Sequence, residues 1–179
     1  MTFPVFASGD VLTATDMNAV GMWLVKTQTI GTAVSSVAVT GAFSTNYENY
    51  LITVSGSVAS TTNFADLTLG AAATGYYMSQ NYMTFNANTV SGISRGNQTR
   101  FVGVASGTTN TFDAAIFVMS PFLSKNTVVH STYQQTITTG ENGVFRGYLA
   151  DTTSYTAFTL TASTGTWTGG TIRVYGLRN

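Results

Sequence analysis

Most of the chain is divided into short segments in which apolar and polar residues alternate, and this period of two is what most limits the fold. The segments are rich in threonine, and clusters of Gly, Ser, Asn or Asp separate them. They recur at 50–55, 112–119, 128–133, 145–149, 158–160 and 172–177. Strands without intervening helices are typical of an antiparallel sandwich or barrel. We therefore predict a mainly β protein, an antiparallel β-sandwich or jelly-roll, from residue 31 to residue 179.

Two of these segments and two turns carry further information. Segments 50–55 and 112–119 are partly apolar on both faces, which predicts strands in the interior of the sandwich. Residues 140–143 end in Asn142-Gly143, a pair that tolerates positive φ and predicts the turn of a hairpin. Residues 164–170 contain three glycines and are expected to join the last two strands by a tight or bulged path.

The first thirty residues differ from the rest because they contain the one segment with helical spacing. Thr13 is a suitable N-cap, and Asp16 three residues later resembles a capping box. These signals predict one short helix between about Thr13 and Met22. We interpret residues 1–30 as an N-terminal docking segment, because it holds too many apolar groups for a free tail. The residues expected to dock are Val5, Phe6, Leu12, Met17 and Trp23.

Charge is scarce: 8% of the residues are Asp, Glu, Lys or Arg, and the formal net charge is zero. A soluble domain usually has about 25%. Seven scattered cations do not supply the basic patch that a nucleic-acid partner requires. A surface of Thr, Ser, Asn and Gly is poorly protected against association, which favours a chain that lies inside a larger assembly. A neutral secreted β protein is the alternative.

No targeting or membrane signal is apparent in the sequence. No segment reaches the roughly 18 apolar residues of a membrane helix, so no membrane insertion is expected. The N-terminal residues lack the charged start and apolar run of a secretion signal. We therefore expect synthesis in a cytoplasm, with release by another route such as lysis of a host.

The residues needed for catalysis are sparse. The chain has no cysteine and a single histidine, His130, inside a predicted strand. The acidic residues are spread singly over turns and strand ends, so neither paired carboxylates nor a metal site can be assembled with any support. We expect no enzyme activity, no metal and no cofactor, and we interpret His130 as a half-buried, hydrogen-bonded strand residue.

Residues 76–85 mix aromatic rings with amides, which is the combination that binds the apolar face and the hydroxyls of a sugar. A second aromatic residue of interest lies in the Gly-Thr loop near the C-terminus. The candidate glycan contacts are Tyr76, Tyr77, Gln80, Asn81, Tyr82 and Trp167. The alternative is that these aromatic side chains pack in the core or between subunits, where tyrosine is also favoured.

Both ends of the chain resemble proteins of phage particles. Residues 6–20, with Leu12-Thr13-Ala14 followed by Asp16-Met17-Asn18, resemble a segment that introduces a short helix in phage tail and fibre proteins. Residues 168–177, with Thr168-Gly169-Gly170 and Val174-Tyr175-Gly176, resemble the closing strand of small β domains in the same group. Between the two ends we identify no further motif, and there are no coiled-coil heptads or β-helical repeats of a fibre shaft.

The resemblance implies a virion component made in a bacterial host, commonly an oligomer and often a homotrimer. Its N-terminal segment would contact other virion proteins. Three interpretations stay open. The first is a tail-associated fibre, knob or tail-tip protein that also adheres to a host-surface glycan. The second is a capsid decoration or head-fibre protein that stabilises the shell. The third is a free carbohydrate-binding module or a hydrolase.

Overall fold

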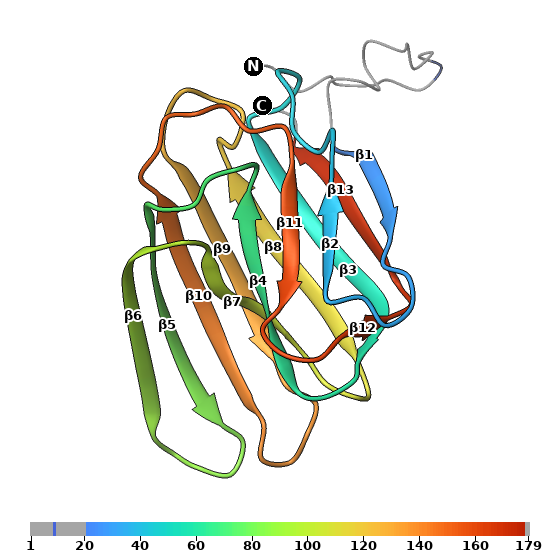
Figure 1. Ribbon diagram of the computed structural model, residues 1–179, viewed down its shortest axis with the longest axis vertical. Helices are drawn as coiled ribbons and strands as arrows, with labels where there is room; N and C mark the ends of the chain where they lie inside the picture. Colours follow the sequence, from blue (N-terminus) through green and yellow to red (C-terminus); the bar gives the residue numbers. More distant parts are fainter. Residues whose placement is uncertain (1–8, 10–20, 178–179) are drawn as a thin grey trace.

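Two antiparallel β-sheets of unequal size pack face to face (Figure 1). The computed structural model describes Gly9 and residues 21–177. Because each sheet is apolar on its inner face, the two bury one shared core between them. The predicted antiparallel β-sandwich is thus confirmed for this part of the chain.

The large sheet contains nine strands and provides the broad face of the molecule. Its main path is β1 (Met22–Thr29), β13 (Thr171–Leu177), β3 (Asn49–Ala59), β8 (Phe112–Met119), β9 (Thr127–Gln134), β10 (Glu141–Leu149), β5 (Tyr76–Thr84) and β6 (Val90–Gln98). The two-residue strand β12 (Trp167–Thr168) pairs with the far end of β3. Strands from both ends of the chain therefore lie side by side at one edge of this sheet.

The small sheet covers the inner face of the large one. Its four strands are, in order, β2 (Ser36–Val39), β11 (Phe158–Ala162), β4 (Asn63–Leu69) and β7 (Phe101–Gly107). Phe101 of β7 packs edge-on against two rings of the large sheet, with ring centroids 4.7 Å from Tyr76 and 5.9 Å from Phe145. Such aromatic contacts join the two layers through one continuous core.

Alternation decides which side chains enter the core. In β3, Tyr50, Ile52 and Val54 are buried, whereas the residues between them face outward. In β8, Ile116 and Val118 are buried in the same way. The six segments with alternating sequence all belong to strands of the two sheets, as predicted.

The glycine-rich loop near the C-terminus also agrees with its prediction. It connects β11 to β13, and its middle forms β12. Gly165, Gly169 and Gly170 all have positive φ, of 66°, 71° and 83°. The three glycines thus allow the bulged path that the sequence indicated.

The predicted turn at Asn142-Gly143 is wrong. Both residues lie inside β10, where Gly143 pairs with Tyr133 of β9 and Tyr82 of β5. The hairpin between β9 and β10 turns earlier, over residues 135–140. Gly143 is needed for a different reason: a Cβ atom there would lie 2.7 Å from the ring of Tyr133.

The sandwich begins earlier in the chain than the sequence predicted. Residues 22–29 form β1 of the large sheet, so the β domain begins at Met22 instead of residue 31. The predicted helix lies outside the described residues except for its last two, Gly21 and Met22, and Met22 already belongs to β1. The docking residues Val5, Phe6, Leu12 and Met17 also lie outside, and Trp23 is half-buried in β1. Within the described part of the chain there is no helix long and apolar enough to span a membrane.

Candidate functional site

The structure separates the predicted glycan-binding residues into buried and surface groups. Tyr76 and Gln80 point from β5 into the core, and Trp167 of β12 is fully buried. Tyr77 and Asn81 point outward from β5, and Tyr82 is half-buried near its end. The alternation of β5 therefore divides a cluster that is contiguous in sequence.

The three buried side chains are occupied by contacts within the core. The Tyr76 hydroxyl accepts a hydrogen bond from the Leu69 backbone N–H at 2.9 Å. The Gln80 amide donates to the Gly103 carbonyl at 2.8 Å. Trp167 stacks on Phe112 with ring centroids 4.6 Å apart. These contacts favour the packing alternative for Tyr76, Gln80 and Trp167.

Asp66 of β4 is a buried acid whose hydrogen bonds join β4 to the start of β7. Its carboxylate accepts hydrogen bonds from Arg100 Nε at 2.7 Å and from the Gly103 N–H at 2.9 Å. Burial raises the pKa of Asp66, and the two hydrogen bonds partly offset that rise. These bonds hold the start of β7 against β4. In the part of the chain that the structure describes, no three His, Cys, Asp or Glu side chains group as a metal site would require.

The outer face of the large sheet is unusual because a set of large apolar side chains lies exposed there. Antiparallel sheets with one solvated face normally carry polar residues on it. Cross-strand pairing places the outward residues of one row in the order Leu24, Tyr175, Leu51, Phe117, His130 and Arg146. The neighbouring row runs Met22, Leu177, Asn49, Met119, Val128, Tyr148 and Tyr77.

We name the part of these rows on β1, β13, β3 and β8 the apolar band. It consists of Met22, Leu24, Leu51, Phe117, Met119, Tyr175 and Leu177. Met22 and Leu24 are 53% and 55% exposed, and Phe117 is 41% exposed. The next outward row is mainly polar and contains Thr27, Arg173, Thr53, Ala115, Thr132, Val144 and Asn81. This polar row limits the band on one side, and contiguous exposed apolar patches commonly mark interaction sites.

Beyond β8 the same rows lead into a hollow with a different chemistry. We name it the Tyr–Arg hollow, and its side chains come from Tyr77, Ser79, Ser94, Asn126, His130, Arg146 and Tyr148. Val128 adds an apolar side chain to its lining. The hollow is open to solvent and has a volume of about 710 Å³. Of the predicted glycan contacts, only Tyr77 lies in this hollow.

Two contacts fix the shape of the Tyr–Arg hollow. Tyr77 and Tyr148 stack with ring centroids 5.2 Å apart and an interplanar angle of 9°. Arg146 NH1 lies 2.9 Å from His130 Nδ1. Because guanidinium only donates hydrogen bonds, Nδ1 is the acceptor and the proton of the neutral ring lies on Nε2. His130 is therefore a hydrogen-bonded strand residue, as predicted.

Asn81 and Tyr82 border a second hollow on the same sheet. It has a volume of about 820 Å³, and its lining combines amides and hydroxyls, including those of Gln134 and Asn142, with apolar side chains such as Val144. The structure therefore brings Asn81 and Tyr82 together but separates them from Tyr77.

Sequence reasoning missed Arg146, Tyr148 and the apolar band. The signal was present in segments 50–55 and 112–119, whose second apolar face proves to be the band. No known protein family matches the sequence, and no curated protein is significantly similar to it.

Proposed function

We propose that this protein is a non-catalytic structural component of a phage particle and that the apolar band joins copies of it. The observation that carries the proposal is the band, because a contiguous set of large apolar side chains exposed on a sheet face commonly marks an interaction site. The resemblance of both chain ends to phage tail and fibre proteins supports the virion setting. Synthesis in the cytoplasm of a bacterial host belongs to the same proposal.

A second copy of the chain is the occupant that the band fits best. The core of a protein–protein interface is enriched in aromatic residues and methionine and depleted in charge, and the band has this composition. A net charge of zero means that identical copies do not repel one another. A homotrimer is the state we propose, by analogy with the proteins that the chain ends resemble.

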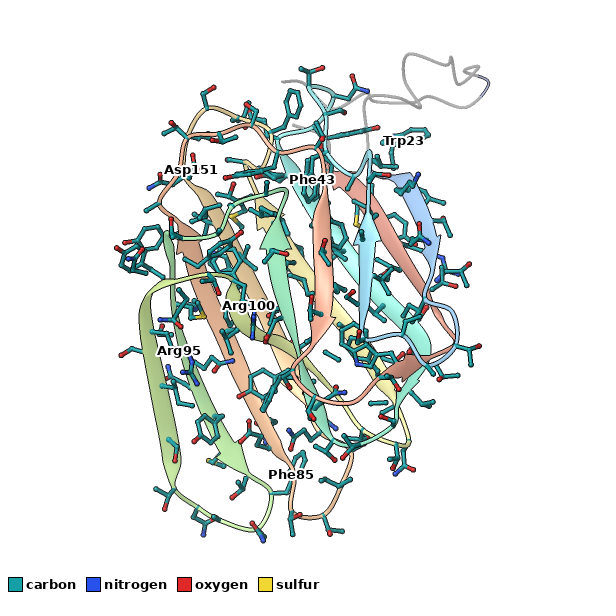
Figure 2. All side chains as sticks on the ribbon, in the orientation of Figure 1. Trp23, Phe43, Phe85, Arg95, Arg100 and Asp151 are labelled. Carbon is teal, nitrogen blue, oxygen red and sulfur yellow. The ribbon has the colours of Figure 1, made fainter. Side chains whose placement is uncertain are left out.

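A place at the phage tail, as a short knob or tail-tip protein, is the first choice within this proposal. Trp23 and Phe85 lie at opposite ends of the sandwich (Figure 2). Attachment through the N-terminal segment would then leave the end near Phe85 facing away from the particle. Gold-labelled antibody on purified particles, viewed by electron microscopy, tests this placement. Label at the tail supports it, whereas label over the whole head favours the capsid decoration alternative.

Replacing Phe117 with glutamate is expected to dissociate the oligomer. Phe117 lies on β8 at one end of the apolar band and is 41% exposed, and an aromatic anchor that becomes buried in an interface typically contributes about 2 kcal/mol or more to association. Self-association should therefore weaken about 30-fold or more. Light scattering at micromolar concentration should give three times the chain mass of 18.9 kDa for the unaltered protein and the single mass for F117E.

Thr132→Glu is the matched control, because Thr132 is exposed on the same outer face but outside the band. Both variants should melt near the temperature of the unaltered protein, since exposed substitutions usually change stability by about 0.5 kcal/mol or less. An unaltered protein that is monomeric, or an F117E variant with the mass of the oligomer, would refute the subunit contact. The second result would be expected if the N-terminal segment of the same chain covers the band.

A further inference from the structure

We propose that the Tyr–Arg hollow binds an acidic saccharide and that Arg146 is the residue that recognises its anionic group. The proposal deepens the proposed function, because it names the chemistry of the host-surface ligand that a virion protein would contact. It also moves the site away from most of the residues that the sequence indicated. The saccharide could carry its charge as a carboxylate or as a phosphate, and both pair with guanidinium in the same way.

Arg146 has no acidic neighbour in the hollow. Its cross-strand neighbours are His130 on β9 and Ser79 on β5, and both are uncharged in this arrangement. In the described residues the ion pair between Asp66 and Arg100 is the only one, and it belongs to the small sheet. The lining of the hollow includes no carboxylate. An anion entering the hollow would therefore meet attraction without a competing acid.

The Arg146 side chain is held in place by a hydrogen bond to His130. One nitrogen, NH1, donates to His130 Nδ1 at 2.9 Å, which fixes the orientation of the planar group. A guanidinium has five N–H donors, so most of them stay available to a ligand. A pre-oriented fork loses less side-chain entropy when it binds a carboxylate or phosphate in bidentate fashion.

The remaining surface of the hollow combines aromatic rings with hydroxyl and amide groups. Tyr148 is 41% exposed and is held by its stack on Tyr77. Tyr148 therefore offers a ligand a rigid apolar ring and a hydroxyl. Ser79 and Ser94 pair across β5 and β6, and Asn126 approaches from the start of β9. Hydroxyl and amide groups around an aromatic surface match the hydroxyls and apolar ring faces of a sugar. An acidic peptide has fewer hydroxyl groups than a saccharide and would form fewer hydrogen bonds with these side chains.

The test measures binding of three saccharide probes to the full-length protein by calorimetry. The probes are an oligogalacturonate with carboxylates, a maltotetraose phosphate with a phosphate group, and neutral maltotetraose. We expect one or both acidic probes to bind, more weakly as salt rises, and maltotetraose not to bind. Preference for carboxylate or phosphate would identify the anionic group. A failure of both acidic probes, or equal binding of maltotetraose, would overturn the proposal.

Arg146→Gln should weaken binding of the acidic probe about tenfold or more, because a charge-assisted pair is lost. The matched control is Arg173→Gln, which removes a cation from the same outer face, where Arg173 NH1 donates to Ser55 Oγ at 2.9 Å. The control should bind as the unaltered protein does. Equal losses in the two variants would show non-specific charge attraction and refute the site. Binding of a polyglutamate peptide as tight as that of the acidic probe would refute the saccharide assignment.

The outcome is separable from that of the proposed oligomer. R146Q should keep the melting temperature and the mass of the unaltered protein, because Arg146 lies outside the apolar band. Loss of binding with unchanged mass concerns the hollow alone. Binding by a monomeric protein would support the hollow while contradicting the subunit contact.

Discussion

Replacing Gly170 with alanine is expected to lower the free energy of unfolding by about 4 kcal/mol or more. Gly170 has a φ of 83°, where an L-residue is strained by about 1–2 kcal/mol. A Cβ atom would also lie 2.6 Å from the Ser57 nitrogen and 2.7 Å from the Ser55 oxygen. Both are backbone atoms of β3, so no side chain can rotate away. Losses of this size arise only from a few causes, and backbone strain is one of them.

The position of Gly170 explains why the backbone comes so close. The pairing of β3 with β8 shifts register between Val54 and Ser57, which marks a bulge in β3. The carbonyl of Gly170 accepts a hydrogen bond from the Ile30 N–H at 3.2 Å, just after β1. A displaced Gly170 would therefore disturb β1, β3 and β13 together, at the edge where both ends of the described chain meet.

Gly169→Ala is the matched control for this prediction. Gly169 is the preceding residue and has a similar φ of 71°, but the nearest atom to its added Cβ would be 3.7 Å away. It should lose only the conformational cost of about 1–2 kcal/mol. Urea unfolding of both variants, followed by circular dichroism, gives the comparison. Equal losses would show that φ alone matters and that the contact with β3 does not.

The sequence predicts those strands whose inward residues are large and regularly spaced. β8 was predicted with the bounds that it has, because its four inward and four outward residues alternate without interruption. β6 was missed because it consists mainly of Ser, Gly, Arg and Asn, and none of its residues is fully buried. β6 lies at the edge of the sheet and buries little side-chain surface, so its sequence does not show the alternation of apolar and polar residues that identifies a strand.

Gly143 shows a second limit of local reasoning. Asn-Gly is a strong turn signal because both residues accept positive φ, but neither has it here. The glycine is required by the ring of Tyr133, a residue on the neighbouring strand. Such a requirement comes from register between strands, which the local pattern does not contain.

The candidate sites depend on register even more strongly. The apolar band combines residues from β1, β3, β8 and β13, so its members are separated by most of the chain. Leu51 and Phe117 looked like residues of an interior strand, because apolar character on both faces is the usual sign of burial on both faces. Knowledge of the sheet order was needed to see that no second layer covers the outer face in the described part of the chain.

Replacing Trp167 with alanine is expected to lower the free energy of unfolding by about 3–5 kcal/mol, as for other buried aromatic truncations. The side chain is fully buried, and its loss removes the stack on Phe112 at 4.6 Å. It also removes the hydrogen bond from Trp167 Nε1 to Asn63 Oδ1, which measures 3.2 Å. Asn63 is itself buried, so its carbonyl oxygen would lose that donor without gaining access to water.

Trp167→Phe separates packing from hydrogen bonding. It keeps an aromatic ring against Phe112 but leaves Asn63 Oδ1 without its donor, so a loss of about 1–3 kcal/mol is expected. Val90→Ala is the exposed control, since Val90 is 68% exposed, and it should change stability little. Melting curves and binding of the saccharide probes, measured on each purified variant, decide between the two interpretations of Trp167. A W167A protein that melts normally but no longer binds the probes would restore the glycan role, because a core residue must affect folding before it affects recognition.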